Sequence, residues 1–546
     1  METWTRRSIL LGMGGAIGSA AFPVIGRAAQ SGNFGVVVYG ATPSGIMAAY
    51  AAAREGASVA LVMAGAFGGM CAQGLGWSDT GKIGVVGGLC MEFFRRVARL
   101  YNPTSTSFVK NFEPHIAEQA FRAMIREAGV TTIHVATLAG VAGSARKIQS
   151  IQLTDGTVLT AQAFVDASYE GDLMAAARCA CSVGRESSTR FNEPNAGFDA
   201  IPANHHVPTR DSRGNLFPII KPYPAQARFT ADRAVQCYTF RLCVSNDPAN
   251  KAAFPKPPGY DADRYGFELA LLASPNKDFS PAPVGHSKFD VNGNYFGGPW
   301  DWAEGNAARR RAIFTEHYNY QAGLLYFYAN DPRVPSAFRE QVNQYGLAKD
   351  EFVGTGNWPR QLYIREARRL SGRYVMTQGD AQTAVTKLHP VGMGSYSLDS
   401  HAPQVLEIKN GYMDYEGTFG TIETRGTTPY QIPYESLLPK EYDNLLVSVC
   451  VSASHVAYAS VRMEPQYMIM GEAAGCAAAL VAQRRTISIA LAAEITSKVQ
   501  RYGAVMAYTV TAAAKAADGA GSSSPTASSA AADAEPERAV RLDPLY

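Results

Sequence analysis

The chain has 546 residues, of which 47% are hydrophobic and 18% are charged. This is an ordinary globular balance, and the length is sufficient for two or three lobes with sizeable cores. The formal net charge of +3 at pH 7 is too small to indicate a nucleic-acid-binding protein. No basic stripe with interleaved aromatic residues is present either.

The first 30 residues have the features of an export signal. Arg6 and Arg7 precede an apolar stretch, 8–21, that glycines interrupt. We predict a twin-arginine signal peptide over residues 1–30 that is cleaved, with an uncleaved anchor as the alternative. The mature protein is then expected to be periplasmic or secreted, to use the twin-arginine export machinery as a partner, and to keep no stable membrane span.

A strand–turn–helix–strand unit follows. The pattern predicts a buried strand over 34–39, an alanine-rich helix over 43–55 and a second strand over 58–63. The turn before the helix has glycines where a dinucleotide-binding fingerprint has them, and the helix N-terminus can present N–H groups to a pyrophosphate. The residues of this turn that we predict to bind the cofactor are Gly40, Thr42, Pro43, Ser44 and Gly45.

Two positions depart from the fingerprint. Thr42 stands where the middle glycine is usual, and Met63 stands where an acidic residue for the ribose hydroxyl is expected. Either another group takes the part of that acid, or the adenosine end is held loosely.

A glycine-rich segment, 67–79, comes soon after the second strand. So many glycines predict backbone that passes close to a flat ligand, and a plain surface loop is the alternative. The residues of this segment that we predict to bind the cofactor are Gly68, Gly69, Met70, Leu75 and Gly76.

Together with later motifs, these segments resemble a known family. Over roughly residues 34–490 the chain resembles the bacterial FAD-dependent oxidoreductases related to the fumarate reductase flavoprotein group. The motifs are Tyr39-Gly-Ala-Thr-Pro-Ser-Gly45, Gly68-Gly-Met70 with Gly74-Leu-Gly76, Phe164-Val-Asp-Ala-Ser-Tyr-Glu-Gly-Asp172, Leu362-Tyr-Ile-Arg-Glu-Ala-Arg-Arg369, Asp399-Ser-His401, Ser454-His455, Arg462-Met-Glu-Pro465 and Gly471-Glu-Ala-Ala-Gly475.

The resemblance implies an α/β fold in which an FAD-binding Rossmann-like domain of the glutathione-reductase type carries an inserted α+β substrate lobe. The cofactor is expected to be FAD. The predicted parts are the FAD-binding domain over 34–190 and 431–495, the substrate lobe over 191–430, and a disordered tail over 512–546 that is poor in large apolar residues. The other predicted elements are helices over 117–127, 364–376 and 465–483, strands over 131–141, 163–167 and 442–451, and a hairpin over 148–159.

Further cofactor contacts are expected at the end of a strand and at the start of a helix. Asp166 ends a buried strand, where acidic groups can bind ribose or ordered water, while helix capping is the alternative for Asp172. Glu464 opens the last long helix, whose N-terminus can stabilise negative charge on a reduced flavin. The further residues that we predict to bind the cofactor are Leu138, Asp166, Gly171, Asp172, Glu464 and Glu472.

Two histidines on these motifs are candidates for the general base. An imidazole can take a proton from an alcohol or amine as hydride leaves the carbon. We rank His455 first and His401 second, and a structural role is the alternative for each. Arg365, with Arg368 and Arg369 on the predicted helix, could hold a substrate carboxylate or phosphate, or the three could form salt bridges between lobes. The predicted catalytic residues are His455, His401, Arg462, Tyr363 and Arg365.

These observations predict FAD-dependent oxidation of a small organic substrate by hydride transfer to the flavin. No second redox centre and no metal-ligand spacing is visible in the sequence, so electrons are expected to pass to oxygen or to a separate acceptor. The eight cysteines are interpreted as buried thiols with at most one or two disulfides. Two alternatives remain: FAD that serves a lyase or isomerase, and a flavin-binding protein without turnover.

Overall fold

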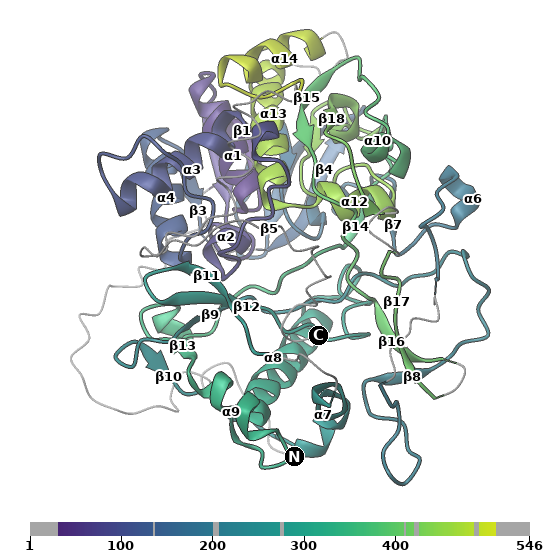
Figure 1. The fold of residues 1–546 in the computed structure, drawn as a ribbon. Helices are drawn as coiled ribbons and strands as arrows, with labels where there is room; N and C mark the ends of the chain where they lie inside the picture. The colour runs from purple at the N-terminus through teal and green to yellow at the C-terminus, as the bar shows by residue number, and fades with distance from the viewer. Residues whose placement is uncertain are drawn as a thin grey trace.

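The structure is a computed structural model that describes residues 31–134, 137–199, 207–273, 278–408, 411–419, 425–484 and 491–508. The predicted signal peptide over 1–30 and the predicted tail over 512–546 lie outside the described residues. Figure 1 shows an upper lobe built from the beginning and the end of the chain, and a lower lobe built from its middle.

A seven-stranded mixed sheet forms the centre of the upper lobe, in the order β3-β2-β1-β6-β5-β4 with β19 also paired to β6. The strands β3, β2, β1, β6 and β19 run parallel, and the β4–β5 hairpin joins the first half of β6 antiparallel. This arrangement confirms the predicted Rossmann-like α/β fold. The strands are β1 Gly32–Tyr39, β2 Val59–Val62, β3 Thr131–Ile133, β4 Leu138–Ser144, β5 Lys147–Leu153, β6 Val158–Asp166 and β19 Leu445–Val447.

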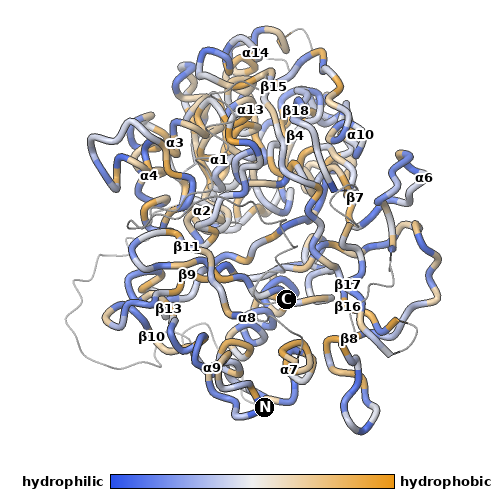
Figure 2. The backbone as a smooth tube through the Cα atoms, viewed as in Figure 1, coloured by the Kyte–Doolittle hydropathy of each residue, from blue (hydrophilic) through white to orange (hydrophobic). Residues whose placement is uncertain are grey.

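Two helices from opposite ends of the chain pack together on this sheet. A Cβ atom at Gly471 would lie 2.1 Å from the Ser44 carbonyl oxygen, and one at Gly475 would lie 2.2 Å from that of Ala48. Figure 1 shows α1 in purple beside α13 in yellow, and Figure 2 shows hydrophobic residues gathered around them. The helices of this lobe are α1 Pro43–Arg54, α2 Gly69–Ala72, α3 Gly88–Tyr101, α4 Pro114–Glu127, α5 Asp172–Ala176, α13 Glu464–Arg484 and α14 Ala492–Arg501.

The lower lobe is α+β. Its five-stranded sheet has the order β10-β13-β9-β12-β11, and the long helix α8 lies beside it in Figure 1. The elements are β9 Leu242–Ser245, β10 Lys251–Ala252, β11 Ala282–Gly285, β12 Lys288–Val291, β13 Gly346–Ala348, α7 Gly266–Leu272, α8 Ala307–Asn330 and α9 Ser336–Asn343.

Short elements connect the two lobes or pack on α13. Strand β8 joins β16 and β17 in a three-stranded sheet, β7 pairs with β14, and β15 pairs with β18. They are β7 Cys181–Val183, β8 Ile220–Pro222, β14 Arg368–Leu370, β15 Pro390–Gly394, β16 Gln404–Glu407, β17 Met413–Glu416, β18 Tyr430–Pro433, α6 Ser188–Phe191, α10 Gln378–Gln382 and α12 His455–Val461.

Most predicted elements are present, but the helix predicted over 364–376 is wrong. That segment is extended, and β14 within it pairs antiparallel with β7. The strand predicted over 131–141 divides into β3 and β4, which lie at opposite edges of the sheet. The second strand of the predicted hairpin continues through 163–167 as the single strand β6, and the strand predicted over 442–451 is only three residues long.

None of the helices within the described residues combines the length and the apolar character needed to cross a bilayer. All eight cysteines are free thiols, and only Cys181 is exposed.

The close crossing of α1 and α13 generates a stability prediction. Gly475→Ala should lower the free energy of unfolding by about 1–3 kcal/mol, because the added methyl group overlaps the α1 backbone. Gly140→Ala is the matched control, since a Cβ atom there meets nothing within 4 Å. Chemical denaturation measures both variants, and equal stabilities would contradict the prediction.

Candidate active site

The turn between β1 and α1 lies at the carboxyl ends of the parallel strands. Gly40 has a φ of +104°, and a Cβ atom at Gly45 would lie 1.9 Å from the Gly40 carbonyl oxygen. The Oγ1 of Thr42 accepts a hydrogen bond from the Gly45 N–H at 3.2 Å and donates one to the Ala167 carbonyl at 2.8 Å. A threonine therefore fits at the middle position of the fingerprint because its side chain ties the turn to the end of β6.

The glycine-rich segment folds back over this turn. The Gly68 N–H donates to the Ala41 carbonyl at 2.9 Å. A Cβ atom at Gly69 would lie 2.6 Å from Cδ of Pro43. The predicted cofactor residues of the turn and the beginning of the loop are thus neighbours in space.

Buried polar atoms without partners mark the beginning of α13. Within the described residues, Oε2 of Glu464 and both amide atoms of Gln466 have no hydrogen-bond partner. The Tyr169 hydroxyl accepts from the Met70 N–H at 2.9 Å and donates to the other oxygen of Glu464 at 2.6 Å. Burial raises the pKa of Glu464 to about 8, so its carboxyl group is protonated at neutral pH. An amide and a neutral carboxyl group match the alternating carbonyl and N–H groups of a flavin pyrimidine edge, so these residues fit FAD.

Other glycines of the loop have neighbours in the protein itself. A Cβ atom at Gly74 would lie 1.8 Å from the Arg241 carbonyl oxygen, and one at Gly76 would lie 2.5 Å from that of Phe112. Leu75 is buried between them. Close contact with neighbouring protein backbone therefore explains why glycine occurs at these two positions, and no ligand contact is needed to explain it.

Two of the predicted cofactor residues in the strand region contact neighbouring protein groups. The Asp166 carboxylate accepts from the N–H groups of Ser168 at 3.0 Å and Met174 at 2.7 Å, and burial raises its pKa to about 6. Gly171 has a φ of +68° at the start of α5. The Leu138 N–H donates to the Tyr39 hydroxyl at 3.1 Å. These contacts shape the sheet edge beside the β1–α1 turn.

Asp172 and Glu472 are held by groups of the protein. Asp172 pairs with Arg310 at 2.7 Å and Arg368 at 3.0 Å, which ties α5 to the start of α8. Glu472 accepts from the Leu89 N–H at 2.6 Å, at the beginning of α3, and burial raises its pKa to about 8. Asp172 is thus paired within the protein, which fits a structural role, whereas the second carboxylate oxygen of Glu472 has no hydrogen-bond partner among the described residues.

Four of the predicted catalytic residues come together with one further carboxylate. Arg462 donates to the Tyr363 hydroxyl at 2.9 Å and to Oδ2 of Asp399 at 2.8 Å. Nε2 of His401 lies 3.2 Å from the same Asp399 oxygen. The Arg365 guanidinium lies over the Tyr363 ring, 4.9 Å from its centroid. We call Tyr363, Arg365, Asp399, His401 and Arg462 the Tyr363 cluster.

Separate elements position these side chains. The Tyr363 N–H donates to the Thr239 carbonyl at 2.8 Å, which fixes the segment before β14 against the lower lobe. Asp399 and His401 stand in the connection between β15 and β16. Arg462 lies between α12 and α13, two residues before Glu464. The cluster therefore adjoins the end of α13 that fits the flavin.

The electrostatics of the cluster favour a neutral histidine beside a charged aspartate. Burial and the positive charge of Arg365 lower the pKa of His401 to about 4. Burial opposes ionisation of Asp399, but His401, Arg462 and Arg365 together hold its pKa well below the usual range. The side chains of Asp399 and His401 remain 29% and 23% exposed, so small molecules can reach them.

Sequence reasoning missed four residues around this cluster. Asp79 is hydrogen-bonded to Tyr396, and burial raises the pKa of Asp79 to about 6. Nδ2 of Asn294 lies 3.2 Å from Nδ1 of His401, and Arg365 donates to Asn292 at 3.3 Å. The asparagines alternate directly after β12, so the period-two rule for strands could have placed them on one face.

His455 lies in a different cluster. The ring atom Nδ1 of His455 is 2.9 Å from both carboxylate oxygens of Glu366, and the backbone N–H of His455 donates to the Glu186 carboxylate at 2.9 Å. The side chain is fully buried, and the Phe419 ring packs edge-on against it. Its Nε2 atom has no hydrogen-bond partner within the described residues, but the ring is closed off from solvent and held by Glu366, which favours the structural alternative for His455.

The three neighbouring arginines have different partners. Arg368 pairs with Asp172, and Arg369 pairs with Glu186 at 2.6 Å and with Glu366. Within the described residues Arg365 has no acidic partner, and its contacts are with the Cys237 carbonyl, Asn292 and the Tyr363 ring. The salt-bridge alternative therefore applies to Arg368 and Arg369 but not to Arg365.

A group of acidic and histidine side chains lies between α4 and β12. Glu113, His115 and Glu351 carry ligand atoms close enough together to hold one metal ion. The Lys288 ammonium group, however, lies 3.2 Å from Glu113 and 2.9 Å from Glu351. This lysine makes the group an ion-pair network that joins the two lobes.

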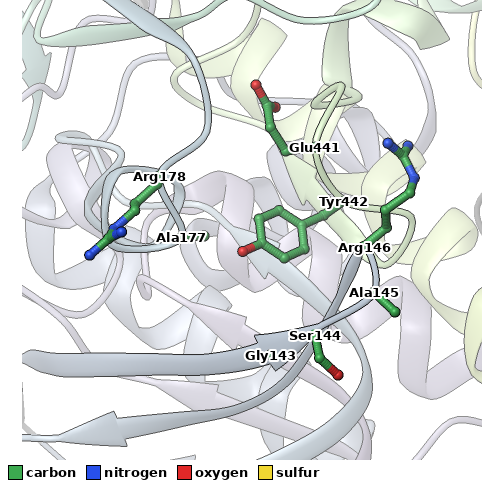
Figure 3. Close-up of a pocket in the computed structure, with 8 residues that line it drawn as sticks. All are labelled: Gly143, Ser144, Ala145, Arg146, Ala177, Arg178, Glu441 and Tyr442. Carbon is green, nitrogen blue, oxygen red and sulfur yellow. The ribbon is translucent and has the colours of Figure 1, made fainter.

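A surface pocket of about 290 Å³ lies beside the β4–β5 turn, and Figure 3 shows the residues that line it. None of the predicted site residues lines it. Its lining residues are Gly143, Ser144, Ala145, Arg146, Ala177, Arg178, Glu441 and Tyr442.

Residues 35–501 match the family model described as FAD dependent oxidoreductase. The chain belongs to this family. The family match and the sheet topology confirm the predicted FAD cofactor and FAD-dependent oxidoreductase class. No curated relative matches the chain.

The solved structures with detectable similarity match over short stretches. An L-proline dehydrogenase from P. horikoshii has 14% identity over 29% of this chain and 59% of its own, with a TM-score of 0.23. The amino acid oxidase NikD has 13% identity over 28% and 56%, with a TM-score of 0.22. A flavin-dependent brominase has 14% identity over 29% and 42%, with a TM-score of 0.22. The chain thus spans about half the length of these proteins, and matches at these TM-scores support no assignment of a substrate.

The geometry of the β1–α1 turn predicts loss of the cofactor in one variant. Gly45→Val should yield protein without bound FAD, because the side chain would overlap the Gly40 carbonyl and separate α1 from β1. The ratio of flavin absorbance to protein absorbance after purification measures this. Gly140→Val is the control with open space, and stoichiometric FAD in Gly45→Val would contradict the prediction.

Proposed function

We propose that this protein oxidises a small organic substrate by hydride transfer to FAD, outside the cytoplasm. The observation that carries the proposal is the Tyr363 cluster, which is partly exposed and adjoins the α13 end whose free polar atoms fit a flavin. When bound, FAD supplies the hydride acceptor. The relation to the fumarate reductase flavoprotein group belongs to the proposal and rests on the sequence motifs.

In this proposal His401 accepts the substrate proton. Its Nε2 carries hydrogen toward Asp399, which leaves Nδ1, beside Asn294, as the basic atom. The substrate hydroxyl or amine takes the place of the Asn294 amide and gives its proton to Nδ1. The charged Asp399 stabilises the imidazolium that forms.

The reaction balances with the groups named. The hydrogen of the substrate C–H bond would leave with both bonding electrons as hydride for the bound FAD to accept, the O–H or N–H proton would go to His401, and a carbon–oxygen or carbon–nitrogen double bond would form in the product. Oxygen or a separate electron acceptor then takes the electrons. Arg462 holds the Tyr363 hydroxyl in place beside the reacting atoms.

The role of His401 generates a kinetic prediction. His401→Asn should keep FAD but slow anaerobic reduction of the flavin by the substrate about 10²- to 10⁴-fold, because the general base is lost. Since the pKa of His401 in the substrate-free protein is lowered to about 4, the second-order rate constant of wild-type flavin reduction, measured at low substrate concentration, should fall only as the pH falls through about 4, and this limb should be absent in the variant. Stopped-flow absorbance measures both.

His455→Asn is the matched control. The substrate should reduce the flavin of this variant at close to the wild-type rate, although loss of the contact with Glu366 should lower the stability of the variant. A wild-type rate of flavin reduction in His401→Asn would contradict the assignment of His401 as the general base. The wider proposal would fail if a panel of alcohols and amines turned over anaerobically with no acceptor and no flavin reduction, because that result identifies a lyase or isomerase.

The proposed location rests on Arg6 and Arg7, and it has its own test. Replacing both with Lys should leave the FAD-loaded precursor in the cytoplasm, because the twin-arginine route reads that pair. Cell fractionation with immunodetection measures the distribution. Unchanged export of the double variant would contradict the location.

A further inference from the structure

Arg365 is a buried cation without an acidic partner. Arg365 as a whole residue is 1% exposed to solvent. Among the residues that the structure describes, no carboxylate lies within salt-bridge distance of it, and its Nε atom has no hydrogen-bond partner. Its contacts are the Cys237 carbonyl at 2.5 Å, Asn292 at 3.3 Å and the face of Tyr363.

The same segment contains a second buried arginine that, unlike Arg365, has acidic partners. Arg369, four residues later, is equally buried but pairs with both Glu186 and Glu366. A buried guanidinium without a counter-ion is costly, whereas a paired one is tolerated. The structure thus satisfies Arg369 within the protein and leaves the charge of Arg365 for another group.

The acidic side chains near Arg365 do not neutralise its charge, because each of them has another partner. Asp399 already contacts both Arg462 and His401. Arg241 pairs with Asp290 at 2.7 Å. Asp79 is hydrogen-bonded to Tyr396, and its pKa is raised, as expected for an acid that burial keeps partly protonated.

We propose that the substrate of this site carries a carboxylate and that Arg365 binds it, with the substrate lying over Tyr363 toward His401. The proposal rests on the function proposed above. A guanidinium binds a planar carboxylate through two parallel hydrogen bonds. The single unpaired positive charge of Arg365 matches a ligand group that carries one negative charge. Asn292 contacts Arg365, and Asn294, two residues later, contacts His401, so the reacting C–H group is expected close to the carboxylate.

Equilibrium binding to the oxidised, FAD-loaded protein tests this without turnover. Acetate and benzoate are titrated while the visible flavin spectrum and the heat of binding are recorded, with acetamide and benzamide as neutral analogues of the same shape. The carboxylates should bind saturably and the amides at least about 10-fold more weakly. Arg365→Gln should weaken carboxylate binding about 10- to 100-fold, the usual effect of losing a charged hydrogen-bonding partner, and Arg365→Lys should lie between.

Arg373→Gln is the matched control. Arg373 lies on the same segment but already pairs with Asp443 at 2.9 Å, so its replacement should leave carboxylate affinity unchanged. If Arg365→Gln does not retain FAD, the comparison of carboxylate with amide in the wild type and the affinity of Arg365→Lys decide the question.

Three results would overturn the inference: equal affinity for carboxylates and amides or no carboxylate binding in the wild type, undiminished carboxylate binding in Arg365→Gln, or tighter binding of inorganic phosphate than of acetate. Carboxylate binding through Arg365 together with failure of every compound to reduce the flavin would instead refute the proposed function and leave this inference standing.

Discussion

The charge balance of the Tyr363 cluster is the feature on which the proposed chemistry of this protein depends. Two buried guanidinium groups, Arg365 and Arg462, lie on the Tyr363 ring, and within the described part of the chain Asp399 is the one carboxylate paired with either of them. Burial together with this excess of positive charge keeps His401 neutral, and the same positive charges hold Asp399 ionised. An anion beside Arg365 would offset part of the charge that lowers the pKa of His401, so the base would become stronger when the substrate is in place.

The fold brings this cluster to the cofactor by joining distant parts of the chain. The β1–α1 turn comes from the beginning of the chain, and α13 comes from its end. Their close contact through Gly471 and Gly475 places the start of α13 beside the turn. Because Arg462 and Glu464 are two residues apart, a short stretch of backbone links the Tyr363 cluster to the end of α13 proposed to face the flavin.

Local sequence patterns were sufficient for the parts of the fold that local chemistry decides. The strand, glycine turn and helix over 34–55, and the helix from Glu464, were predicted closely because apolar periodicity and turn residues fix them. The segment 364–376 was predicted incorrectly. Its four arginines and Ala367 favour a helix, but the partners that bury Arg369, namely Glu186 and the Gly184 carbonyl, require an extended chain there.

The ranking of the two histidines could not come from the sequence. His401 and His455 both lie on motif positions, and their difference is created by Asp399 in one case and by Glu366 in the other. The same holds for the glycines: a Cβ atom at Gly69 would meet the β1–α1 turn and one at Gly76 would meet Phe112, and only the tertiary structure shows which neighbour each glycine accommodates.

The central claim concerns where the flavin lies relative to the Tyr363 cluster. A crystal structure of the FAD-loaded protein grown with benzoate tests it most directly. The account predicts the flavin ring between the β1–α1 turn and the start of α13, with its pyrimidine edge on Glu464 and Gln466, and benzoate density on Arg365. A flavin ring bound elsewhere, with the Tyr363 cluster walled off from it by protein, would contradict the account.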